Sequence, residues 1–275
     1  MGPFSKALII YKPVEKCFTL ASESTVYLRS HGVNVLALTV DDLSHTYGLK
    51  TIESDIDLVI SIGGDGTFIR ASKLLLKPLI LPYPCGRRNT YYEYGLPSIE
   101  EVLNRVLSSR FYLEFIPLYQ ICYGSNCSMF INDAVIVSSD LGKASKFSIK
   151  VKTHDIDSDI FIEGDGLIIS TMHGSSGHGL SAGGPLTASI SNVLILNYIN
   201  PIQLSSPSLV IPGFSVLEIV NRNNALLYVD GDHVGNLDKN TNIIVNHGLR
   251  CVKVIRFNPT RDIWRSVLEP RKQIH

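Results

Sequence analysis

The sequence has no excess of charge of either sign. Its 275 residues carry 25 basic and 25 acidic side chains, so the formal net charge is zero at neutral pH. Proteins that bind nucleic acid gain much of their affinity from basic side chains that neutralise phosphates. A general role in nucleic-acid binding is therefore disfavoured, and we expect no nucleic-acid partner.

Cysteine is also scarce. The five cysteines are scattered, with no Cys-x-x-Cys, and lie at positions 17, 85, 122, 127 and 251. This usage predicts a reducing compartment in which each cysteine fills apolar space. No apolar run approaches the length of a membrane span, and the first residues lack a signal-peptide pattern. We therefore expect a cytoplasmic protein without a membrane partner.

The first hundred residues alternate between strand and helix patterns. Apolar runs at 7–11 and 57–62 are typical of buried parallel strands. A helical pattern over 14–30 ends before Gly32, which suits a left-handed position after a helix. Strand and helix in alternation predict an α/β domain with a parallel sheet over residues 1–110.

The remaining sequence is mostly strand. Two runs at 113–123 and 127–137 flank the turn residues 124–126 and predict a hairpin. Many further short strands with turns between them predict a β-rich, antiparallel, sandwich-like domain over residues 111–257. The tail 258–275 is expected to pack back on the first domain.

A glycine-rich turn follows the strand at 57–62 and reads Gly63-Gly64-Asp65-Gly66-Thr67. Glycines allow close approach of a ligand to the backbone, and a helix N-terminus favours phosphate. Asp65 would repel a phosphate unless it holds a metal or accepts a proton from an attacking hydroxyl. The alternative is an ordinary N-cap aspartate.

Two further clusters could face a ligand. The pair Asn132-Asp133 interrupts an apolar strand and indicates either ligand contact or a β-bulge at a sheet edge. The segment 163–185 contains Asp165 and a glycine-rich loop around His173 and His178. Such a loop either approaches a ligand closely or is a flexible surface loop.

These motifs, in this order, resemble the NAD kinase family: Gly-Gly-Asp-Gly-Thr, Asn-Asp, Gly-Asp-Gly-Leu-Ile-Ile-Ser-Thr, and Ser-Ala-Gly-Gly-Pro, between Gly63 and Pro185. The resemblance implies transfer of a phosphoryl group from ATP or polyphosphate to the 2′-hydroxyl of the adenosine ribose of NAD. It also implies Mg²⁺ or another divalent cation as cofactor, and a homodimer or homotetramer.

The resemblance assigns Asp65 as the general base. It implies a set of substrate-binding residues that consists of Gly64, Gly66, Thr67, Asn132, Asp133, Lys146, Asp165, His173, Ser176, Gly177, His178, Ser181 and Asp232. No residue is assigned to a protein-bound metal site, because His173 and His178 lack the third ligand that zinc needs.

The sequence departs from the family pattern at several places. His178 stands where the family usually has tyrosine, and Glu163 stands where many members have a basic residue. Arg87 and Arg88 replace a glycine-rich segment and either bind donor phosphates or lie in a solvated turn. Two other functions therefore stay open: a related lipid or sugar-alcohol kinase, and a dinucleotide sensor without turnover.

Overall fold

The computed structural model describes residues 3–45, 55–74, 77–85, 90–140, 142–154, 157–203, 206–259, 261, 264 and 267. Arg87 and Arg88 lie outside these residues. The chain divides into two compact units. Unit 1 contains Met1–Ile116 and Arg250–His275, and unit 2 contains Pro117–Leu249.

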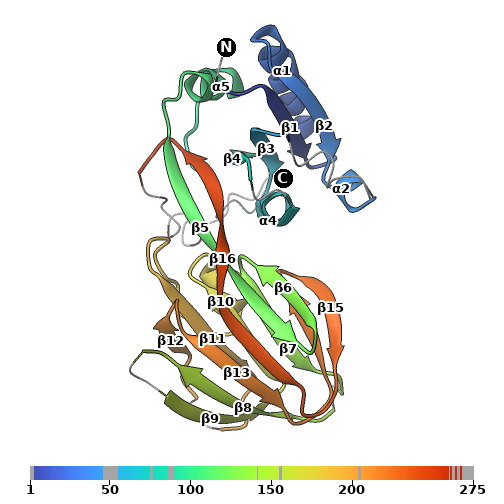
Figure 1. Ribbon diagram of the computed structural model, residues 1–275, viewed down its shortest axis with the longest axis vertical. Helices are drawn as coiled ribbons and strands as arrows, with labels where there is room; N and C mark the ends of the chain where they lie inside the picture. The colour runs from blue at the N-terminus through green and yellow to red at the C-terminus, as the bar shows by residue number, and fades with distance from the viewer. Residues whose placement is uncertain are drawn as a thin grey trace. The chain divides into compact units, whose positions relative to one another are not determined.

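Unit 1 is built on a parallel sheet (Figure 1). Its strands, in order across the sheet, are β2 (Asn34–Thr39), β1 (Lys6–Tyr11), β3 (Leu58–Gly63) and β4 (Leu79–Pro84). The C-terminal end of β16 (Asn242–Arg256) adds a further parallel partner, with Lys253 opposite Leu79. Every residue of β3 is buried, which fits its mostly apolar sequence.

Four helices of unit 1 are α1 (Glu15–Ser30), α2 (Asp42–His45), α4 (Asp65–Leu74) and α5 (Ile99–Leu107). The buried faces of α1 and α5 share one core with alternate residues of the strands, such as Ile9 and Ile60. Ser98 caps α5 by accepting the Glu101 amide at 3.3 Å. Gly32 follows α1 with a φ of 79°, as its position predicts.

Unit 2 contains a six-stranded antiparallel sheet. Its order is β12 (Leu209–Pro212), β11 (Val193–Ile199), β10 (Gly166–Thr171), β7 (Asp133–Ser138), β14 (Ala225–Val229) and β15 (Asp232–Leu237). The η1 turn (Gly174–Ser176) and the short α6 (His178–Ser181) follow β10. Strand β7 of this sheet begins at Asp133, the second residue of the candidate Asn-Asp pair.

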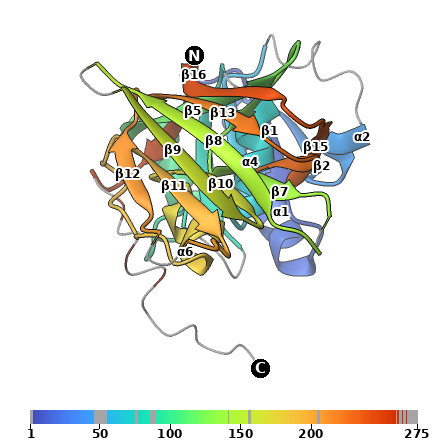
Figure 2. The same ribbon diagram turned by 90° about the horizontal axis from the view of Figure 1, so that it is seen from below.

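A second antiparallel layer completes unit 2. It runs β9 (Asp157–Gly164), β8 (Ser145–Lys152), β13 (Val216–Asn221) and the N-terminal part of β16, and β8 and β9 lie side by side in Figure 2. Alternate residues of β8 are buried, as its polar and apolar alternation predicts. They pack with residues of the other sheet, Ile136 and Leu167 among them, in one core. The α/β and sandwich-like fold classes are confirmed.

The predicted hairpin is present, with one difference. It consists of β5 (Tyr112–Tyr123) and β6 (Asn126–Phe130), and Gly124 takes a φ of 55° in the turn. The second predicted strand run is split, because the chain turns at residues 131–132 before β7 begins. No helix in the described part of the chain is both long and apolar enough to cross a lipid bilayer.

The prediction that every cysteine is a filler is wrong. Cys17 forms a disulfide with Cys85, and Cys122 forms one with Cys127. Cys251 is the free cysteine. The fold brings Cys17 of α1 beside the residue that follows β4, and it sets Cys122 directly opposite Cys127 in the hairpin. Sequence spacing could not indicate the first pair, since 68 residues separate its members.

Candidate active site

The glycine turn of unit 1 connects a buried strand directly to a helix. The carbonyl of Gly64 accepts the amides of Thr67 at 2.9 Å and of Phe68 at 3.2 Å, which starts α4. A Cβ atom on Gly63 would lie 2.3 Å from the Thr67 hydroxyl oxygen, so only glycine fits there. The turn therefore holds the first residues of α4 in a fixed position at the carboxyl end of β3.

Asp65 is the first residue of α4, and its carboxylate does not act as the predicted alternative, an N-cap. One oxygen, Oδ2, accepts the Thr90 hydroxyl at 2.7 Å, and the other, Oδ1, accepts the Tyr91 amide at 3.0 Å. Asp65 is half-buried, and the next residue, Gly66, is exposed. A carboxylate held from one side and open to solvent on another can accept a proton from a bound hydroxyl.

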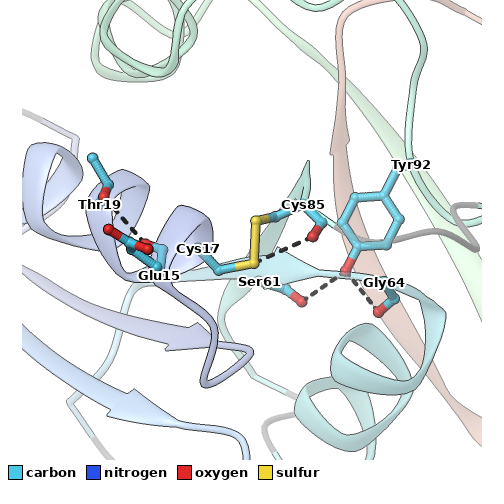
Figure 3. Close-up of a disulfide and its surroundings, with 7 residues drawn as sticks. All are labelled: Glu15, Cys17, Thr19, Ser61, Gly64, Cys85 and Tyr92. Carbon is cyan, nitrogen blue, oxygen red and sulfur yellow. Dashed lines mark hydrogen bonds between the residues drawn. A yellow bond between two sulfur atoms is a disulfide. The ribbon is translucent and has the colours of Figure 1, made fainter. Parts of the chain in front are cut away.

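The buried Tyr92 supports the glycine turn through hydrogen bonds. The Tyr92 hydroxyl donates to the Gly64 carbonyl at 3.0 Å and lies 3.3 Å from the Ser61 hydroxyl (Figure 3). Burial, above all, raises the pKa of Tyr92, so this group is a neutral donor at physiological pH. The Cys85 amide donates to the Gly63 carbonyl at 2.8 Å, so the Cys17–Cys85 disulfide is linked to the start of the turn.

In unit 2, the Asn132-Asp133 pair lies at a corner that the acidic residue Asp230 stabilises. The Asp230 carboxylate accepts the amides of Ile131 at 3.1 Å, Asn132 at 2.8 Å and Asp133 at 3.1 Å. Strand β7, which begins at Asp133, lies between β10 and β14. The alternative of a bulge at a sheet edge is therefore wrong, and the corner has a fixed backbone.

The glycine-rich loop packs against this corner. The Thr171 hydroxyl donates to the Ile131 carbonyl at 2.6 Å and accepts the amides of His173 and Gly174, each at 3.1 Å. A Cβ on Gly174 would lie 2.1 Å from the Asn132 carbonyl oxygen, and one on Gly177 would lie 3.9 Å from an Asp133 carboxylate oxygen. The loop is thus packed in place here, and the glycines permit the close approach.

The loop candidates differ in exposure. Gly177, His178 and Ser181 are exposed, and Ser176 is half-buried at the end of η1. His173 is only 3% exposed, so it belongs to the interior of the loop. The exposed members, from Gly177 to Ser181, are the ones that can contact a ligand.

The three remaining candidates are Asp165, Lys146 and Asp232. Asp165 accepts the Asn200 side-chain amide at 2.8 Å, just before β10. Lys146 lies on β8, in the other sheet, and its ammonium is 3.7 Å from the Glu163 carboxylate. Asp232 is exposed at the start of β15. Asp232 comes two residues after Asp230, whose carboxylate accepts the Asn132 amide.

Sequence reasoning missed the residues that hold the candidates in place. Thr90 and Tyr91 come 25 and 26 residues after Asp65, and nothing in their own sequence marks them. The sequence did contain a signal for Asp230, because Asp-Gly is a common turn pair. In the structure Asp230 has a φ of 49°, as such a turn requires. The family resemblance assigned Asp232, just after the same turn, instead.

Comparison with known proteins finds similarity in both units of the chain. Residues 12–111 match the profile of the ATP-NAD kinase N-terminal domain, and residues 131–257 match that of the ATP-NAD kinase C-terminal domain. The NAD kinase of Saccharolobus solfataricus is 31% identical over 229 residues, covering 82% of this chain and 89% of that protein. The NAD kinase of Pyrococcus abyssi is 29% identical over 231 residues, covering 82% of each.

Solved structures have the same fold. Yeast NADH kinase complexed with NADH has a TM-score of 0.84 and 20% identity, covering 98% of this chain and 88% of the other. An NAD kinase from Archaeoglobus fulgidus in complex with ATP has a TM-score of 0.72 and 19% identity, covering 96% of each chain. The fold and the glycine-aspartate turn place the chain among the two-part α/β kinases. The chain belongs to the NAD kinase family.

Proposed function

We propose that this protein transfers a phosphoryl group from ATP to the 2′-hydroxyl of the adenosine ribose of NAD, which gives NADP. Family membership over both units supports this activity. The observation that carries it is Asp65, a half-exposed carboxylate in the first turn of α4, directly after a glycine turn. The likeness to a structure with NADH and to one with ATP supports the two substrates.

In the proposed reaction, Asp65 accepts the proton of the ribose hydroxyl as its oxygen attacks the terminal phosphorus. A new oxygen–phosphorus bond forms, the bond to the leaving ADP oxygen breaks, and the proton goes to the Asp65 carboxylate. The N-terminal end of α4, where Gly66 is exposed, favours the negative charge of phosphate through the positive end of the helix dipole. Gly64 completes this turn.

We assign the acceptor dinucleotide to residues of unit 2. The fixed corner at Asn132 and Asp133 offers an amide and a carboxylate for the adenosine part, in line with the family motif. A Cβ on the exposed Gly177 would lie 3.9 Å from an Asp133 carboxylate oxygen, so Gly177 and the exposed His178 after it can cover the ligand. Asp165 is a further dinucleotide contact in this proposal.

A divalent cation, Mg²⁺ in our proposal, fits a site made of the Asp65 carboxylate and nucleotide phosphate oxygens. Mg²⁺ in phosphotransferases is held by one or two carboxylates together with phosphate oxygens and water. No group of three metal-ligating side chains occurs among the described residues, so the nucleotide phosphates would supply most of the ligands and Asp65 the nearby carboxylate. When bound, the cation neutralises charge on the phosphates.

We also propose a cytoplasmic location, from the sequence composition, and a homodimer or homotetramer, from the family resemblance. Polyphosphate is a second donor that the resemblance allows.

A panel of donors and acceptors tests the activity. We expect NADP when NAD is incubated with ATP and Mg²⁺, detected with an NADP-specific dehydrogenase. Phosphorylated lipid or sugar alcohol without NADP, or NAD binding without any product, would contradict the proposal.

A further inference from the structure

The Asp65 carboxylate is held by a segment that is itself fixed from the other side. Thr90 and Tyr91 donate to its two oxygens, as described above. A carboxylate offers about four lone-pair positions. Among the described residues, these two donors take one position on each oxygen, and the side chain stays half-exposed. The segment therefore orients the carboxylate and leaves it able to accept a substrate proton.

Two arginines from the C-terminal part of unit 1 hold the carbonyls of the same two residues. Arg256 donates to the Tyr91 carbonyl at 2.8 Å, and Arg261 donates to the Thr90 carbonyl. Their side chains are each 3% exposed. Thr90 and Tyr91 are thus bound on their carbonyl side by arginine while their donor groups bind Asp65.

Glu114 holds the two arginines in place. Its Oε2 accepts Arg256 at 2.6 Å, and its Oε1 is 3.2 Å from Arg261. Burial, and then the neighbouring Arg261, lowers the pKa of Arg256 to about 10, while Glu114 acts in the opposite direction. The Arg256 guanidinium therefore stays protonated at neutral pH, paired with the Glu114 carboxylate.

Ring contacts complete the support. The Tyr91 ring stacks on Phe68 of α4, with centroids 4.5 Å apart and planes 23° apart. The Arg261 guanidinium lies over the Tyr91 ring at 5.3 Å from its centroid. Glu93 accepts the amides of Phe257 at 3.0 Å and Asn258 at 2.8 Å, which fixes the C-terminal segment to the same stretch of chain.

We propose that Thr90 is a positioning residue for the reaction, and that Arg261 positions Asp65 through Thr90. This inference rests on the proposed function, because it takes Asp65 as the group that accepts the proton. The ordinary explanation is that these contacts only stabilise unit 1. The two explanations differ in what a variant at Thr90 does to turnover.

The test compares Thr90→Val, which removes the hydroxyl at nearly the same volume, with Thr90→Ser, which keeps it. A misaligned catalytic group lowers the rate much more than it lowers binding. We expect Thr90→Val to lower kcat by about 10- to 100-fold with KM for NAD changed by less than about twofold. Thr90→Ser should recover most of kcat. Arg261→Gln should lower kcat in the same direction, by a smaller factor.

Thr25→Val is the matched control, because Thr25 donates to the Ala21 carbonyl within α1, away from the turn. Its kcat should equal that of the parent. A Thr90→Val enzyme with parental kcat would overturn the inference, as would a Thr90→Ser enzyme as defective as Thr90→Val. A loss confined to melting temperature would show that the contacts are only structural.

An activity-independent measurement separates this inference from the proposed function. The Tyr91 amide donates to Asp65, so Asp65→Ala should speed its hydrogen exchange, measured by NMR, by about tenfold or more. An unchanged exchange rate would refute the contact on which the inference depends. If the parent forms no NADP, the proposed function fails, and the exchange rate alone then decides whether the segment holds Asp65.

Discussion

The Cys17–Cys85 disulfide should contribute more to stability than the Cys122–Cys127 disulfide, because it closes a much longer loop. The sequence separations are 68 and 5 residues. A cross-link lowers the entropy of the unfolded chain by an amount that grows with the logarithm of loop length. That relation gives about 4.4 kcal/mol for the long loop and about 2 kcal/mol for the short one at 25 °C.

Thermal unfolding with and without a dithiol reductant measures each contribution. In the Cys122→Ala/Cys127→Ala variant, reduction breaks only the long-loop disulfide and leaves both of its thiols in place. A destabilisation of about 4 kcal/mol corresponds to a fall in Tm of roughly 10 °C for a domain of this size.

The reciprocal variant, Cys17→Ala/Cys85→Ala, is the matched control. Reduction there breaks only the hairpin disulfide and should lower Tm by about half as much. A Tm that falls equally in both variants, or that does not respond to the reductant in the first, would refute the loop-length reasoning. Mass spectrometry before and after reduction confirms which thiols are linked.

Two further variants test local contacts. Gly174→Ala places a methyl group 2.1 Å from the Asn132 carbonyl oxygen, so urea unfolding should show a loss of about 1–3 kcal/mol and calorimetry weaker NAD binding, whereas Gly142→Ala, near an open turn, should change neither. Hydrogen bonds, chiefly from the Ser5 hydroxyl, lower the pKa of Asp57 below its ordinary value of 3.8. Its stabilisation is therefore complete above that pH and lost as the pH falls below it, so Asp57→Asn should flatten the acid limb of Tm against pH; parallel curves would contradict this.

Local patterns in the sequence predicted most of the fold. β3 is buried at every residue, as in a strand covered on both faces of its sheet. β8 is buried at alternate residues, as in a strand covered on one face. Gly32 marked a helix end through its own backbone chemistry, since it takes a positive φ. Each of these signals lies within a few residues of the feature that it predicts.

The contacts that define the candidate site act over longer separations. The Asp65 carboxylate is bound from residues 25 and 26 positions away, and Asp230 binds amides nearly a hundred positions away. Tertiary packing brings such groups together, and no periodicity or turn signal encodes their pairing. The Cys17–Cys85 link escaped prediction for the same reason. The sequence therefore indicated which residues could react and left open what holds them in position.

Asp65→Asn, assayed for both turnover and binding, tests the central claim most directly. The variant keeps the size of the side chain and removes its ability to take a proton. We predict that NADP formation from NAD and ATP falls by at least about 100-fold while NAD affinity stays within a few-fold of the parent. Asp42→Asn, at the exposed first residue of α2, should behave as the parent in both assays. Parental turnover in Asp65→Asn would contradict the assignment of this carboxylate as the proton acceptor.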